Sequence, residues 1–224
     1  MSSSIRRTNS MLLLLFTFGA PLLILFYIIK SDRFPEPNKC IIQVFTMGIF
    51  LCFPAGYLNE FFVGDNQAYL AGLTEESLKY LGFLFFVTKM DAFNERMDAI
   101  VYGALISLGF ATLENYYYVY TMFPQDNSYV TALTRFFTAI PLHAMCGIIM
   151  GYHFGIYYFV KIRKHLFMAL FIPVITHGVY NFLCDYSLSV ILVYIILVLF
   201  YTKKLHEKFV IFQRDKISEV EPKT

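Results

Sequence analysis

Carboxylate, imidazole and amide side chains recur within the long apolar segments of this 224-residue chain. An ionisable group at the centre of a bilayer costs about 2.5–3.5 kcal/mol on insertion scales, so each is a candidate functional residue. Such a set could hydrolyse a peptide bond, because a glutamate can take a proton from water and an imidazole or amide can stabilise an oxyanion. The candidates are Glu60, Glu75, Glu76, Lys79, Glu114, His143, His153 and His177, together with Asn59, Asn115 and Asn181.

Five of these side chains are predicted to lie at a common depth. At 1.5 Å per helical residue, Glu75, Glu76, Glu114, His143 and His177 each lie about 13–15 Å from the outer end of a predicted segment. Four consecutive segments therefore carry acid, acid, imidazole and imidazole at one level. Scattered packing residues would not be expected to agree in this way, so we interpret the level as a reaction site.

The spacing of the candidates adds a second constraint. Lys79 follows Glu75 by four residues and Glu76 by three, so it shares a helix face with both and can hold a carboxylate in its ionised form. Glu75 and Glu76 point about 100° apart, so one can act while the other holds a partner. His177 and Asn181 share one face.

The composition requires a membrane as solvent. The chain is 58% hydrophobic and 15% charged, against about 45–50% and about 25% in soluble domains. Residues 12–29 carry no charge, a length typical of a membrane span. These figures exclude a disulfide scaffold, a disordered chain and an ordinary soluble enzyme. The four cysteines form no CxxC motif and are expected to be reduced thiols.

The predicted fold is an all-α, polytopic transmembrane helix bundle of about seven spans. Residues 1–202 form the membrane domain, and residues 203–224 form a loose, charged cytoplasmic tail. Gly147 and Gly151 follow His143 at four-residue steps and would allow another helix to approach closely. The seven apolar segments are 11–29, 41–63, 66–88, 100–123, 133–160, 166–186 and 187–202.

Basic residues in the loops predict the orientation. Fourteen lysines and arginines are predicted to lie on one side of the membrane. The other side has three, namely Arg6, Arg7 and Arg135. By the positive-inside rule the N-terminus is outside and the C-terminus is in the cytoplasm. The first segment is expected to be an uncleaved span and not a signal peptide.

Each candidate residue also has a structural interpretation. Thr74 could cap a helix whose first turn carries Glu75 and Glu76, and Lys79 could reach the membrane surface with its ammonium group. Glu114 with Asn115, His143, and His177 with Asn181 could join helices by hydrogen bonds. His153, among aromatic neighbours, is expected to be structural, and Glu60 to be interfacial.

Several chemistries fit the residue types. Glutamate and histidine can also bind a metal that activates water, but no HExxH motif occurs, which excludes a zincin-type site on one helix. No serine lies in a nucleophile context, and no aspartate pair resembles GxGD. The alternatives are a proton-coupled transporter or ion pathway, since Glu/His relays serve there too, and a non-catalytic membrane scaffold.

Four motifs in order resemble the PrsW family of glutamic-type intramembrane proteases, which belongs with the CAAX prenyl endopeptidases and bacteriocin-processing proteins. The resemblance covers roughly residues 20–200, and the Glu36-Pro37 pair also fits. The motifs are EExxK at Glu75–Lys79, FxxxEN at Phe110–Asn115, HxxxG at His143–Gly147 and HxxxN at His177–Asn181.

This resemblance implies a multi-pass protease of a bacterial plasma membrane that cuts the outer side of a single-span, anti-sigma factor-like protein. Its partners would be that substrate and the lipid bilayer, with no nucleic acid. The resemblance leaves open whether the protein needs a divalent metal such as zinc. Asn181 stands where some relatives have aspartate, which argues against a metal ligand at that position. The implied catalytic residues are Glu75, Glu76, Glu114, His143, His177 and Asn181, supported by Lys79 and Asn115, with Glu76, His143 and His177 as metal candidates.

Overall fold

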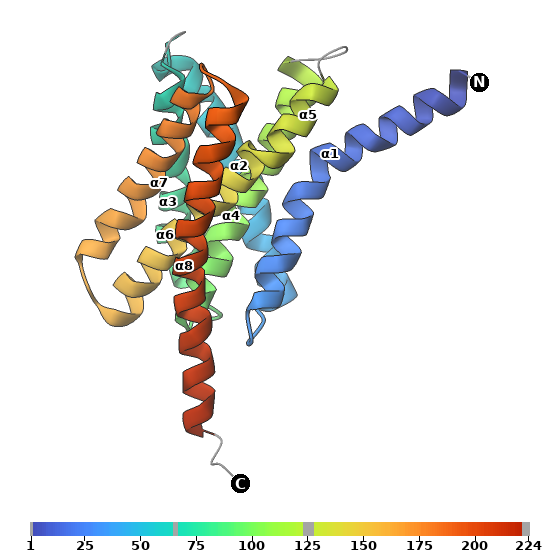
Figure 1. Ribbon diagram of the computed structural model, residues 1–224. Helices are drawn as coiled ribbons and strands as arrows, with labels where there is room; N and C mark the ends of the chain where they lie inside the picture. Colours follow the sequence, from blue (N-terminus) through green and yellow to red (C-terminus); the bar gives the residue numbers. More distant parts are fainter. Residues whose placement is uncertain (1, 65–66, 123–127, 221–224) are drawn as a thin grey trace.

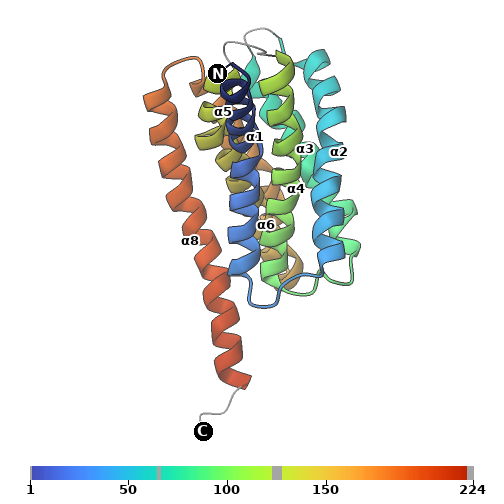
Figure 2. The same cartoon turned by 90° about the vertical axis from the view of Figure 1, so that its right-hand side faces the viewer.

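Helices make up all the regular structure in the described part of the chain, which confirms the all-α prediction. The computed structural model describes residues 2–64, 67–122 and 128–220, and the side chains within these ranges from residue 11 to residue 215. Figures 1 and 2 show the helices packed side by side, with α1 bending away from the bundle toward its N-terminus. The longer helices are α1 (Ser2–Ser31), α2 (Asn38–Phe62), α3 (Ala71–Phe85), α4 (Arg96–Tyr117), α5 (Ser128–Phe137), α6 (Ala139–Val160), α7 (Lys164–Leu183) and α8 (Leu188–Val220).

Six helical stretches are long and apolar enough to cross a membrane, which makes the chain a multi-pass membrane protein. One of them joins α5 to α6 through Thr138, whose φ of −123° and ψ of −76° interrupt the helix. The predicted segment 133–160 thus contains a break. The six stretches are Met11–Ser31, Asn38–Phe62, Arg96–Met122, Ser128–Val160, Lys164–Leu183 and Leu188–Asp215.

The predicted segment 66–88 is a short helix instead of a full span. It consists of α3, which has 15 residues, between two single 3-10 turns, Ala68–Leu70 and Val87–Lys89. Fifteen residues rise about 22 Å, which is short of the roughly 30 Å hydrocarbon core. Its inward face carries Glu75, Glu76 and Lys79. A short helix with a polar buried face can lie within the bundle because the neighbouring helices shield it from lipid.

Helices α4 and α6 form the centre of the bundle, and small residues let them touch. Most residues of the two spans that contain these helices are buried, whereas most residues of the other four spans are not. A Cβ added to Gly151 would overlap the carbonyl oxygen of Ala99, and one added to Gly147 would overlap that of Gly103. The predicted glycine seam is therefore confirmed. The outer helices expose leucine and phenylalanine, as a lipid-facing surface requires.

Helix α8 overturns the expectation of a loose tail. It continues without a break from Leu188 to Val220 and extends past the other helices (Figure 2). Phe209 and Gln213 are buried, and His206 Nε2 lies 2.8 Å from Ser31 Oγ of α1. The expected boundary at residue 203 thus falls inside a helix, because its second half has its own contacts. Residues 221–224 lie outside the described chain.

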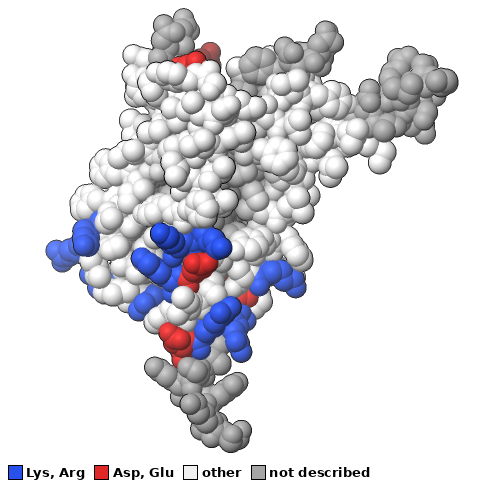
Figure 3. Space-filling model, in the orientation of Figure 1, with Lys and Arg blue, Asp and Glu red and all other residues white. Residues whose placement is uncertain are grey.

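Lysine and arginine gather at one end of the bundle. Figure 3 shows them around the α6–α7 connection and the lower half of α8, with few charges on the rest of that face. The α2–α3 and α7–α8 connections lie at the opposite end (Figure 1). This distribution is the one that the positive-inside rule associates with a cytoplasmic end, and the orientation stays a prediction.

Candidate active site

Helix α3 directs three ionisable side chains into the bundle. Glu75, Glu76 and Lys79 retain at most 4% of their accessible surface. Lys79 Nζ donates a hydrogen bond to Glu76 Oε1 over 2.7 Å, so the two charges are paired. The same ammonium lies 2.9 Å from His143 Nδ1 and 4.1 Å from the ring centroid of Phe110. The lysine therefore belongs to the interior cluster and does not reach the membrane surface.

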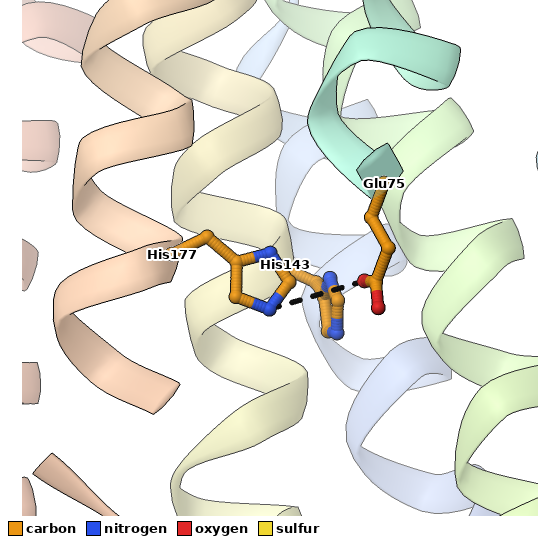
Figure 4. Close-up of side chains that lie close together, drawn as sticks. All are labelled: Glu75, His143 and His177. Atoms are coloured by element: carbon orange, nitrogen blue, oxygen red, sulfur yellow. Dashed lines mark ion pairs between the residues drawn. The ribbon is translucent and has the colours of Figure 1, made fainter. Parts of the chain in front are cut away.

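Two imidazoles from adjacent helices face the acids of α3. His143 of α6 and His177 of α7 are buried, and their ring centroids lie 4.8 Å apart at an interplanar angle of 86°. His177 Nδ1 lies 2.9 Å from Glu76 Oε1. Its other nitrogen, Nε2, lies 3.9 Å from Glu75 Oε2 (Figure 4). The residues that were predicted to lie at a common depth thus form a single cluster.

The hydrogen bonds assign a proton to each ring. Glu76 as a carboxylate can only accept, so His177 donates through Nδ1 and a neutral ring keeps a lone pair on Nε2. Lys79 as an ammonium can only donate, so His143 accepts through Nδ1. His143 then carries its proton on Nε2, which lies 3.0 Å from Glu114 Oε2. The two imidazoles therefore present opposite functions, one a base and the other a donor.

Glu114 joins His143 to a second, largely buried cation. Its Oε2 accepts a hydrogen bond from Arg135 of α5, and both side chains are 13% exposed. Arg135 Nε also donates to Asn115 Oδ1 over 2.9 Å, while Asn115 Nδ2 donates to the Thr17 carbonyl of α1 over 2.8 Å. Asn115 thus holds Arg135 in place and ties α1 to α4.

Glu75 is the one carboxylate of the cluster that forms no ion pair with a lysine or arginine in the described structure. Glu76 pairs with Lys79 and Glu114 pairs with Arg135. Glu75 Oε1 accepts from Asn59 Nδ2 over 3.0 Å, but its buried Oε2 has no hydrogen-bond partner in the described structure. A buried oxygen without a partner is costly. Glu76 Oε2 is also buried without a hydrogen bond, but the charge of Glu76 is paired with Lys79, so Glu75 Oε2 is the better place to bind a water, a metal or a substrate group.

Two contributors were not among the implied catalytic or supporting residues, although Asn59 was one of the candidates. Arg135 is expected in an outer loop, but it lies in α5 and pairs with Glu114. Asn59 of α2 holds Glu75 and in turn accepts a hydrogen bond from Thr74. Arg135 could have been inferred from Glu114, because a buried glutamate requires a positively charged partner. No short motif marks it, because it reaches the site from a separate helix.

Asn181 lies outside the cluster. Its Nδ2 donates to the backbone carbonyl of Ala68 over 3.1 Å, so it ties α7 to the turn before α3. The side chain is one turn beyond His177 and is occupied by this bond. His153, expected to be structural, lies 2.7 Å from His165 Nδ1 through its own Nδ1, away from the site. Glu60 is exposed, as an interfacial residue would be.

The donor atoms also fit a metal in part. Glu75, His143 and His177 each offer a ligand atom within 4.8 Å of the others, and two histidines with a glutamate form one of the known catalytic zinc sets. Glu75 and His177 face each other with free acceptor atoms, whereas both nitrogens of His143 are engaged. Glu76, a sequence-based metal candidate, is absent from this group. Lys79 and His177 occupy its Oε1, while its Oε2 is buried without a hydrogen bond.

A buried group of carboxylates and imidazoles among membrane-spanning helices is compatible with an intramembrane peptidase, and the comparisons with known proteins show that class. The chain belongs to the PrsW family: the profile described as "PrsW family intramembrane metalloprotease" matches residues 9–203. It is 35% identical to "Protease PrsW" of Geobacillus kaustophilus over 175 residues, covering 74% of this chain and 75% of that protein.

Two further relatives carry the same name. "Protease PrsW" of Clostridioides difficile is 34% identical over 198 residues, which cover 79% of this chain and 83% of the relative. "Protease PrsW" of Bacillus subtilis is 34% identical over 176 residues, which cover 74% and 78%. No solved structure matches the chain. The chain is therefore a peptidase, and the predicted family is confirmed.

Proposed function

We propose that this intramembrane peptidase uses Glu75 as the general base that activates water. The observation that carries the proposal is the buried, unpartnered Glu75 Oε2, which lies 3.9 Å from His177 Nε2. A water between these acceptors can donate one O–H to each. Glu76 serves as the partner that orients His177, and the pair of glutamates thereby divides the two roles that their different directions predict.

The remaining steps follow from the protons assigned above. Glu75 takes one proton as the water oxygen bonds to the substrate carbonyl carbon, and the carbonyl oxygen becomes negative. His143 Nε2–H can donate to that oxygen if it gives up its contact with Glu114, and Lys79 supplies positive charge from the other side of the ring. The C–N bond then breaks, and the proton on Glu75 passes to the leaving nitrogen. We assign Asn181 no role in these steps, because its Nδ2 donates to the Ala68 carbonyl.

A divalent metal such as zinc, held by the same residues, is the alternative form of this proposal, because a Glu75 that binds a metal does not act as the free general base. Glu75, His143 and His177 would hold it, with Glu76 fixing His177 from behind, a support that metal-bound histidines commonly have. A bound ion would polarise the carbonyl and supply a more acidic water. His143 would have to give up its contact with Lys79 or with Glu114 to take part.

The proposed substrate is a single-span membrane protein of anti-sigma factor type, cut near the outer face. The family membership supports this choice. The site also lies near the start of α3, toward the end of the bundle opposite the basic residues (Figure 3). If that basic end is cytoplasmic, the cleavage point lies toward the outer leaflet.

The test is co-expression of the protein with an epitope-tagged single-span anti-sigma factor-like reporter. We expect Glu75→Gln, Glu76→Gln and His177→Ala to abolish the cleaved product at unchanged protein level. Glu60→Gln, an exposed acid on α2, is the matched control and should cleave normally. Full cleavage by all three site variants would refute the proposed roles.

A further inference from the structure

A second group of buried acids lies at the basic end of the bundle. Asp32 follows α1, while Glu95 and Asp98 begin α4, and each offers a carboxylate oxygen within 4.8 Å of the others. Asp98 and Glu114 both belong to α4 and are separated by about 24 Å of helix. This group is therefore distinct from the peptidase site.

Helix capping explains part of this group. The Glu95 side chain accepts the backbone N–H of Asp98, and Asp98 Oδ2 accepts that of Glu95 over 2.6 Å, which forms a capping box. Asp98 Oδ2 also accepts the Asn94 N–H over 2.7 Å. Acids at a helix N-terminus are stabilised by its dipole. Capping gives no reason for a third carboxylate from a different part of the chain.

Asp32 is that third carboxylate, and one of its oxygens lacks a partner. The residue is 6% exposed. Its Oδ1 accepts from Phe34 N over 3.0 Å and from Gln213 Nε2 over 2.9 Å. Its Oδ2 is buried without a hydrogen bond in the described structure. Burial raises the pKa of Asp32 and outweighs the two hydrogen bonds from Gln213 and Phe34, which favour the ionised form.

A fourth acid, Glu36, shares a hydrogen bond with Asp98, so one of these two carboxyl groups carries a proton. Glu36 is 7% exposed, accepts a hydrogen bond from the Tyr102 hydroxyl and lies beside Asp98. Burial raises the pKa of Glu36, and the charges of Asp32 and Glu95 raise it further. Within the described side chains, no lysine or arginine forms an ion pair with Asp32, Glu36 or Asp98. A cation bound beside Asp32 and Asp98 could therefore replace the proton that Glu36 and Asp98 share.

We infer that Asp32, Glu95 and Asp98 form a binding site for a hard divalent cation, Mg²⁺ or Ca²⁺. Oxygen-only ligands select such ions over zinc. Gln213 supports the site, because its amide already bridges Asp32 Oδ1 and Glu95 Oε1 from α8. A cation there joins the α1–α2 connection to the start of α4, and Gln213 extends the link to the end of α8.

The experiment is thermal unfolding of the full-length protein in detergent, first with chelator and then with Mg²⁺ or Ca²⁺ in excess. The protein carries Glu75→Gln and His177→Ala, so that a metal in the peptidase site cannot cause the effect. We expect Tm to rise by about 5–10 °C at roughly 100 times the dissociation constant. No rise with either ion overturns the inference.

Asp32→Asn tests the site itself. It keeps an oxygen for Phe34 and Gln213 but lacks the charge, so we expect the cation-dependent rise to disappear. Glu60→Gln, which removes an exposed acid elsewhere, should keep the rise. An undiminished rise in Asp32→Asn overturns the inference. If that variant fails to fold, Tb³⁺ luminescence of the parent protein decides: displacement of Tb³⁺ by Ca²⁺ supports the site, and absence of sensitised emission refutes it.

Discussion

Lys79 Nζ on α3 lies 2.9 Å from His143 Nδ1 on α6, and this contact decides which nitrogen of His143 carries a proton. Without the ammonium, His143 could protonate Nδ1 and present a lone pair on Nε2. The lysine thus influences whether this imidazole donates to an oxyanion or accepts a metal. The same lysine neutralises Glu76, so its effects on stability and on chemistry have to be measured separately.

Lys79→Met separates these effects. It leaves Glu76 as a buried carboxylate without its cation, and breaking a buried pair in this way costs about 3–5 kcal/mol. We expect a large fall in Tm, with most of it recovered in Lys79→Met/Glu76→Gln, where both charges are absent. Thermal unfolding in detergent measures both. A double variant as unstable as the single one would show that the pairing is not the reason.

Glu75→Gln should remove activity without reducing stability. A glutamine can still accept from Asn59 and places no charge at the buried Oε2 position. We expect cleavage to fall by about 10²–10⁴-fold, the usual contribution of a general base, at a Tm equal to or above that of the parent. A quantitative cleavage assay with purified protein checks this. A fall in Tm that accounts for the lost activity would contradict it.

Metal analysis of the purified protein tests the zinc proposal. If Glu75, His143 and His177 hold a metal, the parent should contain about one equivalent, and His177→Ala should contain much less. Activity should disappear with a chelator and return with zinc. Asn181→Ala, a change one turn from His177, should leave the metal content unaltered. A metal-free parent that stays active in chelator would refute the proposal.

Gly151→Ala should destabilise the centre of the bundle. The new Cβ would overlap the carbonyl of Ala99, a backbone atom that cannot move without displacing α4. Overpacking of this kind typically costs about 1–3 kcal/mol. Gly56→Ala on α2 is the matched control, because no atom lies within 4 Å of its added Cβ. Equal Tm values for the two variants would contradict the close approach.

Cys184 offers a test of the predicted orientation. It is exposed in the α7–α8 connection, opposite the basic end, so a membrane-impermeant maleimide should label it in intact cells. Cys40, at the start of α2, should need permeabilised cells. Burial raises the pKa of the Cys184 thiol, so labelling should accelerate as pH rises and more thiolate forms. Labelling of Cys40 alone in intact cells would reverse the topology.

The sequence was most informative at positions where only a functional residue would justify the free-energy cost of burying a charge in the membrane. Ionisable residues in apolar segments are costly, so Glu75, Glu114, His143 and His177 could be identified and placed at one depth without a structure. Arg135 could not be assigned, because a charge near a segment end is equally compatible with a loop. The hydrogen bond of Asn181 to Ala68 could not be predicted for a related reason: helical spacing gives the face of Asn181, but not its height relative to a neighbouring turn. The long α8 was missed, since its contacts with Ser31 and Asp32 are made across the whole chain.

The backbone contacts of the glycines divide the site between two tightly coupled helix pairs. Gly103 and Gly151 lock α4 to α6, and a Cβ on Gly72 of α3 would lie 2.7 Å from the backbone nitrogen of Gly178 of α7. Glu114 and His143 therefore belong to the α4–α6 pair, whereas Glu75 and His177, which face each other, both belong to the α3–α7 pair. If a substrate helix were to part the pairs, the water position would keep its shape. The contact of Lys79 with His143 would be broken, so entry of the substrate and the protonation of His143 would be mechanically linked.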